Sequence, residues 1–116
     1  MPIKEYPGST VHQFIAQRFG AATTVKERNV TVGATVTEVA DNNPRRFYLL
    51  VVNNSIDYMA VSFTREVTAT SGIILAPNGG SVALTAEEDG EATGYALYAI
   101  GIAVGGTVRV IEGVTI

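Results

Sequence analysis

Turn residues divide the sequence from residue 24 onward into short stretches rich in β-branched and aromatic side chains, and this punctuation constrains the fold more than any other feature. The turn signals are DNNP at 41–44, NNSID at 53–57, TSG at 70–72, PNGG at 77–80, EEDGEATG at 87–94 and GG at 105–106. The stretches between them predict strands at 24–32, 34–39, 46–54, 58–64, 72–76, 80–86, 95–102 and 106–112. Short strands with no helical pattern between them favour an all-β, antiparallel β-sandwich, and about eight strands suit a jelly roll.

The segment APNGGSVAL at 76–84 shows how these turns work. Pro77 has a fixed φ and no N–H for a ladder, while Asn78, Gly79 and Gly80 tolerate the positive φ of tight turns. The segment therefore predicts a sharp reversal between antiparallel strands. Glycines 101, 105 and 106 predict a second tight turn, between the final two strands.

Residues 9–19 carry the helical pattern of the chain. The residues that recur there at three-four spacing are Val11, Phe14, Ile15 and Arg18. Gly20 follows them and ends the predicted helix. So short a helix is marginal alone, so its apolar face must dock on its own β domain, on a neighbouring subunit or on a larger assembly. We therefore expect an N-terminal arm with a short helix at 1–22 and one β-sandwich domain at 23–116.

Two predicted strands are apolar on both faces. In the strand 58–64, Met59, Val61 and Phe63 alternate with small or polar residues, which predicts one buried face. RFYLLVV at 46–52 and YALYAIGIAV at 95–104 alternate apolar with apolar instead. A small sandwich covers only its inward faces, so we expect an oligomer, with the arm lying over the surplus face as the competing interpretation. The expected oligomer contacts are Tyr48, Leu50, Val52, Tyr98, Ile100 and Ile102.

Charge and residue types argue against catalysis and several ligand classes. The net charge of −3 and the pI of about 5.0 provide no basic field for nucleic acid. The chain has no cysteine, and His12 is its one histidine. A catalytic pair of nucleophile and base therefore lacks its usual residues, and a zinc site lacks its usual ligands. We expect no enzyme activity, no cofactor, no metal and no small-molecule substrate. Without a spanning apolar run or a secretory signal, we expect no membrane association and synthesis in the cytoplasm.

Two charged segments leave alternatives open. The acidic run EEDGE at 87–91 reads as a solvated loop, with a calcium site as the alternative. Arg45 and Arg46 could pair with carboxylates of a partner, pair locally with Asp41, or remain solvated.

The segments PRRFYLLVVNNSIDYMAVSF, GIILAPNGGSVAL and GYALYAIGIAVGGTVRVIEG, between residues 44 and 113, resemble a β cassette of tailed-bacteriophage structural proteins. These include small capsid decoration (cement) proteins and head-fibre or tail-associated modules. The resemblance implies a jelly-roll-like domain that forms a homotrimer on the virion, outside the icosahedral head, and bridges subunits of the major capsid protein. The capsid contacts would lie on the arm (Val11, Phe14, Ile15 and Phe19).

Two other functions remain open. The chain could be a receptor- or glycan-binding module of a fibre that stacks Tyr58 or Tyr95 on sugar rings, or a small β domain of a tail or connector. Sugar binding needs aromatic rings at loop tips or in a groove, whereas the pattern puts most of them within strands.

Overall fold

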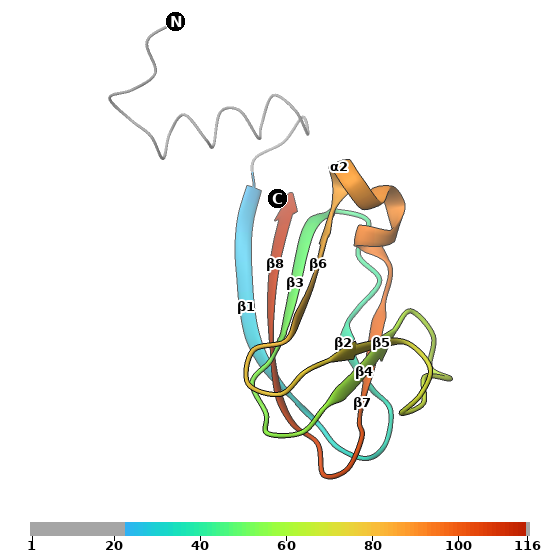
Figure 1. Cartoon of the computed structure of the whole chain (residues 1–116). Coiled ribbons are helices and arrows are strands. Elements are labelled where there is room, and N and C mark those ends of the chain that lie inside the picture. The colour runs from blue at the N-terminus through green and yellow to red at the C-terminus, as the bar shows by residue number, and fades with distance from the viewer. Residues whose placement is uncertain (1–22, 116) are drawn as a thin grey trace, which may run out of the picture.

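The computed structural model describes residues 23–115, which form a sandwich of two four-stranded antiparallel sheets (Figure 1). The first sheet has the order β1-β8-β3-β6, and the second sheet has the order β2-β7-β4-β5. This interleaving of early and late strands is the jelly-roll arrangement, so the predicted fold class is confirmed. The strands are β1 (Thr23–Val32), β2 (Thr37–Ala40), β3 (Arg46–Asn53), β4 (Met59–Ser62), β5 (Ile73–Leu75), β6 (Ser81–Thr85), β7 (Leu97–Gly101) and β8 (Gly106–Thr115).

The core lies between the two sheets and follows the period-two alternation of the strands. Every second residue of β3 and β8 points inward from the first sheet, and the second sheet contributes its own alternating set from β4 and β7. The buried members include Leu49, Val51, Val108, Val110, Met59, Val61, Leu97 and Ala99. One inward face per sheet supplies this core, so the outer faces are left for other contacts.

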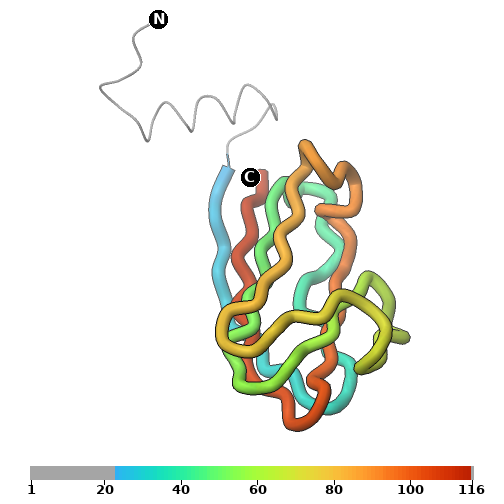
Figure 2. The backbone as a smooth tube through the Cα atoms, in the orientation of Figure 1, coloured from blue at the N-terminus to red at the C-terminus, as the bar shows by residue number. Residues whose placement is uncertain are grey.

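The two layers are visible in the backbone trace (Figure 2). The predicted reversal after residue 76 is present, with Asn78 at φ 60° and Gly79 at φ 120°. It joins β5 of the second sheet to β6 of the first, so the two strands pair with β4 and β3 and not with each other. The predicted turn between the last two strands also lies where expected, with Gly105 at φ 77°.

The acidic run is helical, so its prediction as a loop is wrong. Residues Ala86–Asp89 form the α-helix α2, and Gly90–Gly94 form the 3₁₀ helix η1. The Glu88 backbone N–H donates to the Thr85 side chain at 3.3 Å, and the Thr85 N–H donates to the Asp89 carboxylate at 2.8 Å. This reciprocal cap begins the helix, and acidic residues are favoured in a first turn.

Strand ends account for the other corrections. Strand β4 ends at Ser62, so Phe63 is 39% exposed and does not share the buried face of Met59 and Val61. The strand predicted at 34–39 begins only at Thr37. The predicted arm 1–22 and its helix 9–19 lie outside the described residues. The same holds for the side chains assigned to them, which include Val11, His12, Phe14, Ile15, Arg18 and Phe19. Within residues 23–115, no helix has the length and apolar character needed to cross a membrane.

Candidate interaction surfaces and an end cleft

The outer face of the second sheet carries an exposed apolar patch, here called the isoleucine face (Tyr58, Ile74, Ile100 and Ile102). Ile74 and Ile100 both lie opposite Ala60, one from each neighbouring strand. The Ile102 N–H donates to the Tyr58 carbonyl at 3.1 Å, which brings those two residues side by side. Three of the four side chains are clearly exposed, Tyr58 by 51%, Ile74 by 46% and Ile102 by 39%. The patch thus draws its side chains from β5, from β7 and from the residues beside Asp57, with the buried Ala60 of β4 between Ile74 and Ile100.

Two loops next to the isoleucine face carry further exposed apolar side chains, and Asp57 joins these loops. Ile56 and Val104 are highly exposed in the β3–β4 and β7–β8 loops. The Asp57 carboxylate accepts the N–H groups of residues 103, 104 and 105 at 2.8, 2.9 and 2.8 Å. These backbone hydrogen bonds, with that from Gly105 the strongest, hold the pKa of Asp57 below its ordinary value. The clamp fixes the two loops relative to each other.

Tyr98 shares this outer face but is covered within the chain. Arg65 lies over its ring at 4.7 Å from the centroid and approaches Glu38 at 3.9 Å. Within the chain the Tyr98 ring therefore faces a cation, and its role as an oligomer contact stays a prediction.

The other three predicted contacts lie on the outer face of the first sheet. Tyr48, Leu50 and Val52 point away from the core, and Ile111 lies opposite Leu50 on β8. These four residues, called the tyrosine face, are half-buried. The ion pair of Arg109 with Glu27, at 2.7 Å, borders them. The three predicted contacts from β3 and the three from the region of β7 therefore lie on opposite sides of the sandwich. They cannot form one continuous patch.

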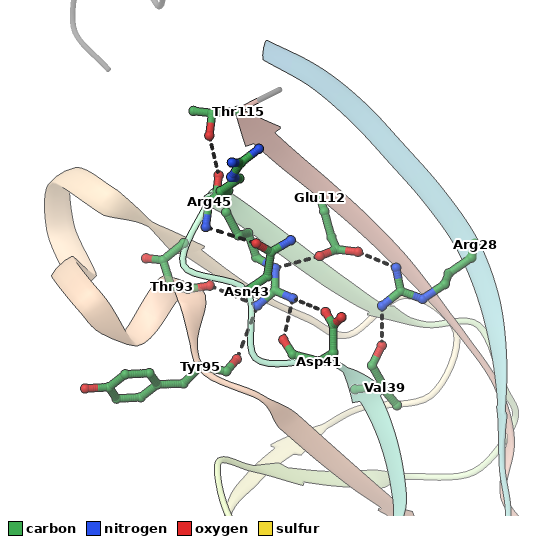
Figure 3. Close-up of polar contacts among 10 residues, drawn as sticks. Arg28, Val39, Asp41, Asn43, Arg45, Thr93, Tyr95, Glu112 and Thr115 are labelled. Carbon is green, nitrogen blue, oxygen red and sulfur yellow. Dashed lines mark hydrogen bonds and ion pairs between the residues drawn. The ribbon is translucent and has the colours of Figure 1, made fainter. Parts of the chain in front are cut away.

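A buried ionic cluster joins the sheets near one end (Figure 3). The Arg46 Nε donates to Glu112 Oε1 at 2.6 Å, and Arg28 pairs with the other carboxylate oxygen. Arg46 also donates to the carboxylate of Asp41 at 3.1 Å and to the carbonyl oxygens of Asp41, Thr93 and Tyr95. Every arm of the Arg46 guanidinium thus has an acceptor. The local pairing with Asp41 is confirmed, and Glu112 was not predicted.

The charge state of Glu112 follows from this cluster. Burial alone would raise the pKa of its carboxyl, but the hydrogen bonds and positive charges of Arg28 and Arg46 outweigh that effect. The net pKa lies below the ordinary value, so Glu112 is ionised near neutral pH. A sequence signal existed: Glu112 continues the inward set of Val108 and Val110, and an inward carboxylate requires a cation.

A cleft of about 670 Å³ opens beside this cluster, at the end of the sandwich where α2 lies. Its two walls are held together, because the Asn43 N–H donates to the Gly94 carbonyl at 2.7 Å and buried Arg46 donates to the Tyr95 carbonyl. The half-exposed Tyr95 ring meets Phe63 edge-on at 6.2 Å. The lining residues are Asn42, Pro44, Arg45, Arg46, Phe47, Ala86, Gly90, Glu91, Gly94, Tyr95 and Thr115.

Metal binding has no support in the geometry of the described residues. Between residues 23 and 115, no three His, Cys, Asp or Glu side chains gather closely enough to hold a metal ion. The acidic residues of α2 and η1 are included in that statement. Among the described residues, the two apolar faces and the end cleft remain candidate features for binding.

Comparisons with known proteins assign no family. No protein-family model and no curated protein matches the chain. Among solved structures, the chain is similar to a protein of Bacillus endospore appendages, described as disulfide-linked pili, with 17% identity, a TM-score of 0.49 and coverage of 82% of this chain and 88% of that one.

The chain is also similar to two solved enzymes. One is dTDP-4-dehydrorhamnose 3,5-epimerase from Bacillus anthracis, with 14% identity, a TM-score of 0.44 and coverage of 89% of this chain and 60% of that one. The other is a Pseudomonas putida prolyl-4-hydroxylase, with 14% identity, a TM-score of 0.41 and coverage of 92% and 60%. This chain thus matches 60% of each enzyme's length. With TM-scores below 0.5, none of the three likenesses assigns a function to this chain.

Proposed function

We propose that this chain is a non-enzymatic structural protein of a tailed-phage virion, a capsid decoration protein that trimerises on the outer head surface and stabilises the major capsid protein lattice. The observation that carries the proposal is the isoleucine face. Apolar patches that run across several strands are typical of surfaces that contact another protein. The resemblance of residues 44–113 to phage structural proteins is the reason for proposing a phage head as the assembly that this chain joins.

The placement of the two apolar faces supports an oligomer with head-to-tail contacts, which either close into a ring such as a trimer or continue as a filament. A two-fold dimer joins the same patch on both subunits, whereas a trimer joins two different patches of each subunit. The isoleucine face and the tyrosine face are two different patches on opposite outer surfaces. One copy can therefore present its isoleucine face to the tyrosine face of the next.

The mechanism proposed for the trimer is thermodynamic. A protein that binds the expanded lattice and not its unexpanded or dissociated forms stabilises that lattice by mass action. Three linked attachment points allow weak contacts to add to a long-lived one. We propose that the arm supplies these contacts through Val11, Phe14, Ile15 and Phe19.

The proposal is tested by the mass of the full chain in solution and by its attachment to heads. We expect light scattering to give three times the 12.2 kDa of one chain. Ile74→Glu should lower that mass, because it places a charge within the isoleucine face. Ile73→Glu is the matched control, since Ile73 is a neighbouring isoleucine of β5 with 44% exposure that lies outside the face. A monomeric wild type, or a trimeric Ile74→Glu variant, would overturn the proposed interface.

Head binding tests the second half of the proposal. Purified chain should co-sediment with expanded heads of the phage that encodes it and raise the temperature at which those heads release their DNA. A chain that trimerises yet leaves head stability unchanged would refute the decoration function.

The position of Tyr95 favours glycan binding as a second candidate function. The ring is half-exposed, lines the cleft and lies edge-to-face against Phe63, and an exposed aromatic ring beside a cleft can stack on a sugar. Binding to a glycan array that is lost in Tyr95→Ala would support this candidate, and an array without signal would remove it.

A further inference from the structure

The end cleft is preformed and largely carbon-lined, and this makes it a receptor for apolar side chains. Its lining includes the apolar or aromatic side chains of Pro44, Phe47, Ala86 and Tyr95. The hydrogen bonds of Asn43 to Gly94 and of Arg46 to Tyr95 fix the two walls relative to each other. A preformed site binds at a lower ordering cost than one that must assemble.

The chain itself delivers a segment to this cleft. Thr23, the first described residue, lies opposite Thr115, which lines the cleft. The start of β1, the end of β8 and α2 lie at the same end of the molecule (Figure 1). Only residues 20–22 separate Phe19 from Thr23, and such a linker spans at most about 14 Å.

Charge favours the same occupant. Helices α2 and η1 carry four acidic residues and no basic one, and Glu91 among them lines the cleft (Glu87, Glu88, Asp89 and Glu91). The lining also includes Arg45 and Arg46, and the charge of Arg46 is already paired with Glu112 and Asp41. Residues 9–19 contain Arg18 and His12 and no acidic side chain. The segment that is tethered beside the cleft therefore also has the charge that these acidic residues attract.

We propose that, in the free protein, residues 9–19 dock as a helix in the end cleft of their own chain, with Val11, Phe14, Ile15 and Phe19 toward its apolar wall. The tether keeps the segment at a high effective concentration, so a segment of another copy must compete with it. This inference concerns the free chain and does not rest on the proposed function. The same four side chains are proposed to contact the capsid, so the arm would leave the cleft on attachment.

The test uses the absence of tryptophan from the sequence. Phe14→Trp places a single indole in the segment, whose fluorescence reports its surroundings. We expect emission at shorter wavelength than in urea and severalfold weaker quenching by acrylamide. Both should be independent of protein concentration at dilutions where light scattering shows single chains.

A blocked cleft provides the decisive comparison. Adding Ala86→Arg to the Phe14→Trp chain should abolish the protection, because Ala86 lines the cleft. Ala69→Arg is the matched control, since Ala69 is also half-buried but lies outside the cleft lining. Circular dichroism and urea unfolding identify variants whose β domain remains folded. For an Ala86→Arg chain that fails this check, Glu91→Lys with Glu88→Lys is the second test, and it should weaken the protection.

Three results would overturn the inference. The first is an indole as accessible in the native chain as in urea. The second is protection that persists in a folded, cleft-blocked variant. The third is protection that arises only as concentration rises, which would assign the cleft to the arm of a second copy.

Discussion

Glu112 is the one carboxylate of the described chain that faces two arginines from inside the sandwich. The Arg46 side chain is fully buried and that of Glu112 is 4% exposed. Removing charges from water is costly, and the mutual hydrogen bonds here offset that cost. Loss of Glu112 would leave the buried guanidinium of Arg46 with the exposed carboxylate of Asp41 as its remaining ionic partner.

Glu112→Gln should lower the free energy of unfolding by about 3–5 kcal/mol, because two guanidinium groups would lose their shared counter-charge. Urea unfolding followed by circular dichroism measures the change. The control is Glu27→Gln, which breaks the exposed pair with Arg109 and should cost less than about 1 kcal/mol. Equal losses in the free energy of unfolding would show that the buried cluster stabilises the fold no more than the exposed ion pair does.

Asp57 should make stability depend on pH in the acidic range. Its pKa is held below the ordinary 3.8 by backbone N–H donors. A carboxyl whose pKa is lower in the folded state stabilises that state above its unfolded pKa, and the contribution is lost as pH falls through the folded pKa.

The variant Asp57→Asn isolates this contribution. The stability advantage of the wild type over the variant should be constant near neutral pH and shrink below about pH 4. Glu112 titrates in the same range but is present in both proteins, so it cancels from the difference. An advantage that stays constant down to acid unfolding would contradict the assigned role of Asp57.

At the scale of elements, the β7–β8 turn depends on a close approach of backbones. Gly105 has φ 77°, and a Cβ placed there would lie 2.1 Å from the Val32 carbonyl oxygen. Gly90 also has positive φ, at 59°, but its Cβ would meet open space. The two glycines thus share the conformational constraint and differ in the contact.

Gly105→Ala should therefore destabilise the fold more than Gly90→Ala does. We expect a difference of about 3 kcal/mol, because the backbone of β1 cannot move away without disturbing its pairing with β8. Urea unfolding of the two variants side by side measures it. A difference near zero would mean that the turn relaxes freely.

Turn residues identified the strands because glycine, proline and asparagine act locally. Eight strands and the two main reversals followed from them. The assignment of strands to sheets did not, because β3 pairs with both β6 and β8 through contacts that no local pattern encodes. Helix α2 was missed although Thr85 caps its first turn and Asp89 accepts the Thr85 N–H in return, since the run of acids was read as solvated charge.

The alternation of residues along a strand was enough to predict which side chains point away from the core. The outward direction of Leu50 and Ile100 follows from period two once their neighbours are buried. The sequence could not show that the outward residues of β3 and those of β7 lie on opposite sides of the sandwich, because that depends on which sheet each strand joins. It also could not show that Arg65 covers Tyr98, since that contact crosses from a loop to a strand.

At the scale of the whole molecule, two different apolar faces on opposite sides imply head-to-tail contacts. Such contacts either close into a ring or continue as a filament. A patch that pairs with itself would instead stop at two copies. The number of copies alone does not separate the trimer from other rings, but the kind of contact can be tested directly.

Two variants test the head-to-tail arrangement when they are mixed. Leu50→Arg damages the tyrosine face and leaves the isoleucine face intact, while Ile100→Glu does the reverse. Alone, each should be a monomer, because every contact requires one intact face of each kind. Mixed, they retain one compatible pair of faces, so light scattering should show a one-to-one complex of twice the 12.2 kDa chain mass that grows no further.

The alternative arrangement predicts a different outcome. If the isoleucine face paired with itself, Leu50→Arg would form dimers unaided and Ile100→Glu would stay monomeric in the mixture. Leu50→Arg with Ile100→Glu in one chain is the control, since it has no intact face and should bind neither single variant. Complex formation by that double variant would place the interface elsewhere on the sandwich and refute both faces as contact surfaces.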